Sequence, residues 1–131
     1  MYEKILEEAF VAMKHAYAPY SKYYVGSCVK TKDNNFFRGA NIENASFGLT
    51  NCGERSAIFA TYSQGYRKED IDSIAIVTSG DRLAAPCGAC RQVLSELLMQ
   101  DTPIVLSNGK ETLVTNIAEL LPFQFGEEDL D

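Results

Sequence analysis

The sequence predicts an α/β protein in which a mixed sheet of about five strands is covered by helices on both faces, a three-layer α/β/α arrangement. Segments with helical spacing alternate with short strand-like runs along the 131 residues. The run from Ile71 to Thr78 has a continuously apolar centre at residues 74–77, as in a strand that is buried on both faces. No repeat or linker interrupts this order, so we expect a single domain over residues 1–131.

The expected order of elements is helix, two strands, helix, strand, helix, two strands and helix. Apolar spacing, β-branched runs and turn residues define each one. The predicted ranges are 3–17, 24–32, 36–41, 52–65, 71–78, 87–99, 103–107, 111–116 and 117–121.

Turn residues support the two predicted hairpins and the helix ends. Asp33-Asn34-Asn35 tolerates left-handed backbone, and Asn108-Gly109 is a strong signal for a tight hairpin. Pro19 and Pro122 end the first and last helices because proline cannot continue the helical hydrogen-bond pattern. The second helix stops near Gly65.

Charge and hydropathy exclude two classes of partner. The formal net charge of −6 argues against a protein that follows a nucleic-acid backbone, because such proteins need clustered Lys and Arg. No apolar run approaches the roughly 20 residues needed to cross a bilayer, and no export leader opens the chain. We therefore expect a cytoplasmic protein with a small-molecule ligand and no membrane or nucleic-acid partner.

The four cysteines divide into one without a motif and three with one. In a chain that is not secreted, such cysteines indicate metal binding or catalysis more than a disulfide framework. Cys28 lies within a strand-like run and is expected to be a buried apolar residue of the core. Cys52 stands two residues before Glu54, whereas Cys87 and Cys90 share a later Pro-Cys-Gly-Ala-Cys segment.

Cys52, Cys87 and Cys90 predict one catalytic zinc ion per chain. Structural zinc usually has four protein ligands, whereas catalytic zinc keeps three and leaves one position for water. Both cysteine segments open predicted helices, where the helix dipole favours thiolate. A structural zinc module is the alternative, but it needs a fourth ligand, and the single histidine, His15, lies on the opening helix.

Glu54 is the candidate proton shuttle beside this metal. Gly53 next to it leaves room for a ligand, which favours a catalytic role for the carboxylate. The alternative is a capping box that starts at Asn51, in which Glu54 merely caps its own helix.

Arg55 and Arg91 each follow a residue of the metal motif. Three thiolates and one Zn²⁺ leave a net negative centre, which makes bound water a weaker acid. We hypothesise that one or both arginines donate to ligand sulfurs and draw charge away from them. The alternative is a pair of solvated surface arginines.

The segments Asn51–Arg55 and Pro86–Gln92 closely resemble the zinc-dependent cytidine deaminases. Those enzymes carry a cysteine or histidine before a glutamate and a later Pro-Cys-x-x-Cys segment. The resemblance extends over nearly the whole chain, and it matches the small nucleoside-deaminase branch. The further matching segments are Ala18–Lys22, Val25-Gly26, Asn41–Ser46, Gly48–Thr50, Leu120–Pro122 and Phe125.

The resemblance implies which residues touch a nucleoside. Asn41 and Glu43 would hold the ribose hydroxyls, and aromatic residues would wall the pyrimidine. The aromatic positions fall on Tyr23, Phe47 and Phe125. Three positions depart from the usual pattern: Tyr23 stands where phenylalanine is more usual, Phe47 where tyrosine is common, and Gly53 where alanine is often found.

The activity implied by the resemblance is hydrolytic deamination of cytidine and deoxycytidine in pyrimidine salvage, in which zinc-activated hydroxide attacks C4 and Glu54 moves the protons. The family also implies a homotetramer with shared active sites. An RNA- or DNA-editing deaminase would require a basic surface. A nucleotide deaminase would require a phosphate clamp, and a blasticidin-type deaminase would not require the ribose-holding pair Asn41 and Glu43.

Overall fold

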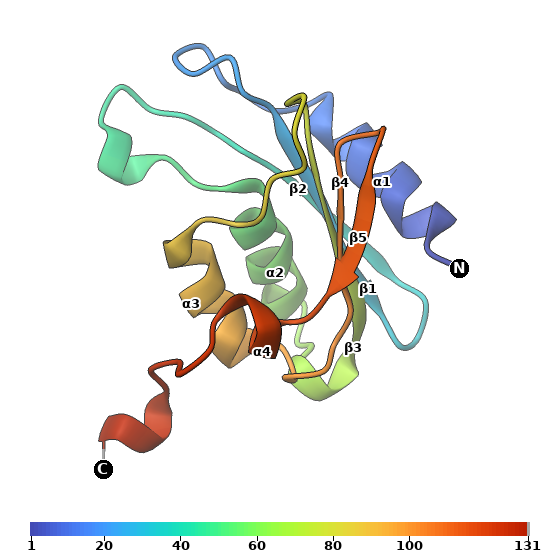
Figure 1. Ribbon diagram of the computed structural model, residues 1–131, viewed down its shortest axis with the longest axis vertical. Helices are drawn as coiled ribbons and strands as arrows, with labels where there is room; N and C mark the ends of the chain where they lie inside the picture. The colour runs from blue at the N-terminus through green and yellow to red at the C-terminus, as the bar shows by residue number, and fades with distance from the viewer. Residues whose placement is uncertain (131) are drawn as a thin grey trace.

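The computed structural model describes residues 1–130 and contains one five-stranded sheet with helices on both faces (Figure 1). The strand order is β2-β1-β3-β4-β5. Strands β3 and β4 are parallel, and the other neighbouring strands are antiparallel. The predicted three-layer fold with a mixed sheet is therefore confirmed.

The helices and strands follow the predicted order, with ends that differ by a few residues. They are α1 (Glu3–Met13), β1 (Val25–Thr31), β2 (Phe36–Ala40), α2 (Gly53–Ser63), β3 (Ile71–Thr78), α3 (Gly88–Leu97), β4 (Ile104–Ser107), β5 (Thr112–Thr115) and α4 (Ile117–Leu120). Three short 3₁₀ turns were not predicted: Phe47–Leu49, Lys68–Asp70 and Glu127–Leu130.

Helix α1 ends at Met13, four residues before the predicted end at Tyr17. The Tyr17 backbone instead pairs with the segment that follows β2. Its N–H donates to the Asn41 carbonyl at 2.8 Å, and its carbonyl accepts from the Glu43 N–H at 2.8 Å. This pairing requires extended backbone, so the helix stops well before Pro19.

The two faces of the sheet are covered by different helices. Helix α1 covers one face, where Ile5 and Ala9 pack with Cys28, Ala75 and Val105. Helices α2, α3 and α4 cover the other, and the apolar residues there form the larger cluster. Its buried members are Val29, Ala57, Ile58, Ile71, Ile74, Ile76, Leu94, Leu98, Ile104, Leu106 and Ile117.

Glycines allow both layers to approach β1 and β2 closely. A Cβ at Gly26 would lie 2.1 Å from the Ala9 carbonyl oxygen in α1. A Cβ at Gly39 would lie 2.4 Å from the Ala57 nitrogen in α2. Neither helix could keep its position if these residues carried side chains.

The two predicted hairpins form with the expected turn chemistry. Asn34 has a φ of 66° between β1 and β2, and Gly109 has a φ of 90° between β4 and β5. Both lie in the left-handed region that asparagine and glycine tolerate. None of the helices among residues 1–130 is long and apolar enough to cross a bilayer.

Candidate metal centre and active site

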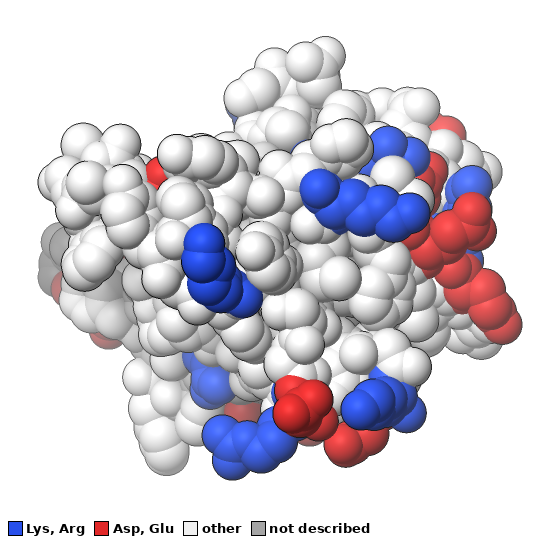
Figure 2. Space-filling view, turned by 90° about the horizontal axis from the view of Figure 1, so that it is seen from above, with Lys and Arg blue, Asp and Glu red and all other residues white. Residues whose placement is uncertain are grey.

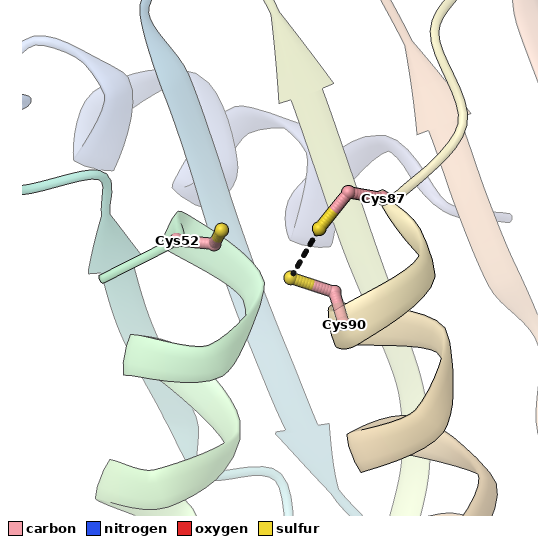
Figure 3. Close-up of side chains that lie close together, drawn as sticks. All are labelled: Cys52, Cys87 and Cys90. Atoms are coloured by element: carbon pink, nitrogen blue, oxygen red, sulfur yellow. Dashed lines mark hydrogen bonds between the residues drawn. The ribbon is translucent and has the colours of Figure 1, made fainter. Parts of the chain in front are cut away.

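Cys52, Cys87 and Cys90 converge between the first turns of α2 and α3 (Figure 3). Cys52 and Cys87 are the N-cap residues of the two helices, and Cys90 lies one turn into α3. The three Sγ atoms lie within 4.8 Å of one another, and the Sγ atoms of Cys87 and Cys90 are 3.5 Å apart. Within residues 1–130 this is the one group of His, Cys, Asp and Glu side chains close enough to share a metal ion.

The sulfur cluster fits a tetrahedral zinc ion. Zn–S bonds of about 2.3 Å at tetrahedral angles place neighbouring sulfurs about 3.8 Å apart. The observed spacing between Cys87 and Cys90 is close to this value. A smaller separation of about 2.05 Å would instead indicate a disulfide, and all four cysteines are free.

The charges of the cluster also indicate a cation. A hydrogen bond from Cys90 and the guanidinium of Arg55 lower the pKa of the Cys52 thiol to about 5. The Cys52 sulfur, followed by burial, raises the pKa of Cys90. The sulfurs therefore oppose one another's ionisation, and a divalent cation between them would allow all three to bind as thiolates.

Glu54 points at the sulfur cluster and does not cap its helix. Its side chain is 5% exposed, and Oε1 accepts a hydrogen bond of 3.1 Å from Cys90 Sγ. Burial raises the pKa of this carboxyl group. The capping-box alternative is wrong, because Cys52 is the N-cap and the Asn51 amide donates instead to Ser56 Oγ at 2.9 Å.

The two arginines occupy different positions. Arg55 Nη2 donates to Cys52 Sγ at 3.2 Å, and its buried Nε meets no acceptor within residues 1–130. Arg91 contacts carbonyl groups: its Nε donates to Pro86 and its Nη1 donates to Leu120, each at 2.7 Å. Arg91 therefore links the residue before Cys87 to α4 and does not contact a sulfur.

Gly53 faces the sheet. A Cβ at this position would lie 3.1 Å from Val25 Cγ1 and 3.2 Å from the Val25 carbonyl oxygen. The small side chain at this point of α2 therefore serves the close approach of the helix to β1. From the sequence, Gly53 was expected to leave room for a ligand, but a Cβ at this position would project towards Val25 of β1.

The residues expected to bind the sugar are engaged with the segment that leads into β1. The Asn41 amide donates to the Tyr23 carbonyl at 2.8 Å and accepts from the Val25 N–H at 2.9 Å. The Glu43 carboxylate accepts from the Tyr20 and Ser21 N–H groups at 3.0 and 3.1 Å. Tyr20 and Ser21 belong to the matching segment Ala18–Lys22, but no role was predicted from the sequence for either residue.

The three expected aromatic residues are separate and exposed. Tyr23 is 37% exposed, Phe125 is 56% exposed and Phe47 is 76% exposed. Phe47 packs edge-on against Tyr20, with ring centroids 6.3 Å apart. The Phe125 carbonyl accepts from the Gln92 amide at 2.9 Å, which ties the C-terminal segment to α3. Nothing in these contacts joins the three rings into one wall.

The end of the molecule that is uppermost in Figure 1 faces the viewer in Figure 2. On this face Lys and Arg side chains are interspersed with uncharged residues and with Asp and Glu, without a continuous basic stripe.

The combination of an α/β/α sheet, three convergent thiols and a buried carboxyl group defines the class of zinc-dependent hydrolytic deaminases. Residues 1–106 match the family profile described as "Cytidine and deoxycytidylate deaminase zinc-binding region". The chain belongs to this family.

Individual relatives agree with this placement. The chain is 47% identical to a cytidine deaminase of Halalkalibacterium halodurans, over 98% of this chain and 97% of the relative. It is 40% identical to a cytidine deaminase of Sporosarcina psychrophila, over 98% and 93%. The crystal structure of a cytidine deaminase from Burkholderia pseudomallei superimposes with a TM-score of 0.91 at 42% identity, covering 95% of this chain and 99% of that one.

Proposed function

We propose that this protein hydrolyses cytidine and deoxycytidine to uridine and deoxyuridine, with release of ammonia. One observation carries the proposal: three sulfurs within 4.8 Å of one another lie beside a buried carboxyl group, 3.1 Å from the sulfur of Cys90. The cytidine deaminases to which the chain is 47% and 40% identical support the choice of substrate.

Cys52, Cys87 and Cys90 would hold the zinc ion. When bound, the zinc supplies a Lewis acid that makes water a nucleophile near neutral pH. Three protein ligands leave one tetrahedral position for solvent.

Glu54 is the residue that moves protons. Its carboxylate accepts a proton from the attacking water and delivers one to N3 of the pyrimidine. A second transfer, to the exocyclic nitrogen, allows the C4–N bond to break and ammonia to leave. The overall change consumes one water and leaves its oxygen on C4. Burial, which raises the pKa of Glu54, brings the carboxyl group closer to the value that suits both steps.

Asn41 and Glu43 are proposed to bind the sugar, and Tyr23, Phe47 and Phe125 to contact the pyrimidine. The resemblance of the surrounding segments to the nucleoside-deaminase branch supports these roles. The half-exposed rings of Tyr23 and Phe125 are available for such contacts. A pair of polar groups that binds the sugar hydroxyls common to both nucleosides rejects analogues that lack those hydroxyls.

The direct test is loss of the cytosine absorbance on mixing with cytidine, deoxycytidine, CMP or blasticidin S. We expect turnover of the two nucleosides and little of the other two. Glu54→Gln should lower kcat by about 10²- to 10⁴-fold while zinc remains bound, because general acid–base catalysis contributes about that much. Full activity of Glu54→Gln, or preference for CMP or blasticidin S, would contradict the proposal.

Arg55 is proposed to stabilise the charge on the metal site through its contact with Cys52. Arg55→Gln should lower activity or zinc affinity by about 10- to 100-fold, as is usual for partners of metal ligands. Arg91→Gln is the matched comparison, because Arg91 contacts carbonyls and no sulfur. Unchanged zinc affinity and activity in Arg55→Gln would exclude the role.

Four copies are proposed to assemble into a homotetramer with shared active sites. Exposed apolar side chains on the C-terminal segment and on the 3₁₀ turn after β2 support association. These are Phe47, Leu49, Phe123 and Phe125. Light scattering on the active enzyme tests the assembly, and a fully active monomer would exclude it. A cytoplasmic location and a role in pyrimidine salvage remain predictions, which cell fractionation and growth on cytidine would test.

A further inference from the structure

The carboxylate of Glu43 is held in place by the loop between α1 and β1. Its Oε1 accepts from the backbone N–H groups of Tyr20 at 3.0 Å and Ser21 at 3.1 Å. Its Oε2 accepts from the Ser21 hydroxyl. Both oxygens are therefore fixed by a loop some twenty residues earlier in the chain.

Ser21 contacts a second part of the expected nucleoside site. Its Oγ accepts a hydrogen bond of 3.1 Å from the Tyr23 N–H. The residue between them, Lys22, has a φ of 57°, a left-handed conformation that is uncommon for residues other than glycine. Such backbone persists where neighbouring contacts specify it, and here the two hydrogen bonds of the Ser21 hydroxyl flank Lys22.

Asn41 contacts the same loop from the end of β2. Its amide bonds the Tyr23 carbonyl and the Val25 N–H, and the backbone of Tyr17 bridges Asn41 and Glu43. The two residues proposed to bind the sugar thus form one hydrogen-bonded unit with Tyr23, one of the three proposed to contact the ring. Within it the Ser21 hydroxyl contacts the Glu43 carboxylate and the Tyr23 N–H.

The contacts leave Glu43 ready to accept a limited number of further donors. The hydrogen bond from Ser21 lowers the pKa of Glu43, which keeps the carboxylate ionised. A carboxylate offers about four lone-pair positions, two on each oxygen. The two N–H groups use those of Oε1 and the hydroxyl uses one of Oε2, so one position on Oε2 remains for a ligand.

We propose that Ser21 is a positioning residue for sugar recognition, which orients Glu43 so that its Oε2 accepts a single sugar hydroxyl. The same serine hydroxyl also fixes the backbone of Tyr23. This inference rests on the proposed function, in which Glu43 binds the ribose. It adds that the recognition depends on a serine that does not itself touch the substrate.

The test compares Ser21→Ala with Ser21→Thr on cytidine and on 2′,3′-dideoxycytidine, which lacks the 2′ and 3′ hydroxyls of the ribose. Ser21→Ala should raise KM for cytidine about tenfold with kcat nearly unchanged, because a hydrogen bond to a charged group is lost. It should leave KM for dideoxycytidine unchanged. Ser21→Thr keeps the hydroxyl and should retain most of the affinity. Ser63→Ala is the control, because the Ser63 hydroxyl bonds only within its own helix, to the Phe59 carbonyl.

A double-mutant cycle separates this inference from the proposed function. Glu43→Gln should raise KM for cytidine more than KM for dideoxycytidine. Adding Ser21→Ala to the Glu43→Gln variant should change KM for cytidine little further. If Glu43→Gln leaves the ratio of the two substrates unchanged, the ribose assignment itself fails. The role of Ser21 is overturned if Glu43→Gln raises KM for cytidine but Ser21→Ala does not. It is also overturned if Ser21→Ala raises KM equally for both substrates.

Ser21→Cys provides a second variant should the alanine variant fold poorly. It has nearly the same shape and a much weaker donor. We expect a rise in KM for cytidine between those of the threonine and alanine variants. Wild-type affinity in Ser21→Cys, with zinc content and thermal unfolding unchanged, would also overturn the proposal.

Discussion

Cysteine side chains lie on both faces of the sheet, and their two environments differ in burial and in charge. Cys28 is fully buried under α1 among Ile5, Ala9 and Val105, with the pKa of its thiol raised to about 12 by burial. On the opposite side, three thiols meet at the N-termini of α2 and α3, beside a guanidinium. Residue type is the same, and the position in the fold decides whether the thiol packs or binds a metal.

The largest predicted effect is the difference between removing a metal-binding cysteine and removing the buried one. Cys87→Ala should abolish activity and lower zinc content well below one ion per chain, because two thiols hold zinc poorly. Cys28→Ala, the matched substitution under α1, should keep both. Zinc content and deamination rate of the two purified variants check this, and zinc loss in Cys28→Ala would contradict the division.

Glycine substitutions compare how closely the two layers pack. Gly26→Ala would place a Cβ 2.1 Å from the Ala9 oxygen and 2.6 Å from the Met13 nitrogen, both backbone atoms. It should lower the free energy of unfolding by about 3 kcal/mol or more, since α1 must move. At Gly53 the Cβ would lie 3.1 Å from a Val25 methyl group, so small shifts suffice. Gly53→Ala should change stability by less than about 1 kcal/mol.

Urea denaturation of the two zinc-loaded variants measures the difference. Equal destabilisation by both substitutions would show that the close approach of α1 is no tighter than that of α2 at these points.

The smallest predicted effect is a dependence of the unfolding free energy on pH, caused by the Cys28 thiol under α1. A thiol whose pKa is raised in the folded protein binds its proton more tightly there than in the unfolded chain. Cys28 should therefore lower stability as pH rises from the ordinary value of 9.0 towards about 12, and it should have no effect below that range. The slope is at most about 1.4 kcal/mol per pH unit.

The difference in unfolding free energy between wild type and Cys28→Ala, measured at pH 8 and pH 10, isolates this contribution from other titrating groups. A difference that does not change with pH would mean that the Cys28 thiol is not protected from ionisation.

The sequence was most informative where one face of an element is buried. The run Ile71–Thr78, with its apolar centre, predicted β3 to the residue, and the hairpins followed from Asn34 and Gly109. The end of α1 was misplaced because apolar spacing continues to Tyr17, whereas the pairing of Tyr17 with Asn41 and Glu43 comes from a distant segment. Periodicity is a local signal and carries no information on such pairing.

In the candidate site, too, local patterns were predicted from the sequence and contacts between distant segments were not. Cys52, Glu54, Cys87 and Cys90 were singled out because metal chemistry needs those residue types at those spacings. The position of Arg91 on two carbonyls depends on where Pro86 and Leu120 come together. Likewise, Ser21 lies in a segment that resembles the family, but its contact with Glu43 depends on the fold and could not be inferred from that segment alone.

The central claim is that three sulfurs from α2 and α3 hold one zinc ion with one position left for solvent. X-ray absorption at the zinc edge of the purified, active protein tests it most directly. The account predicts one zinc per chain with three sulfur ligands at about 2.3 Å and one oxygen ligand. A fourth sulfur or a histidine nitrogen from the protein, or full activity in zinc-free protein, would contradict it.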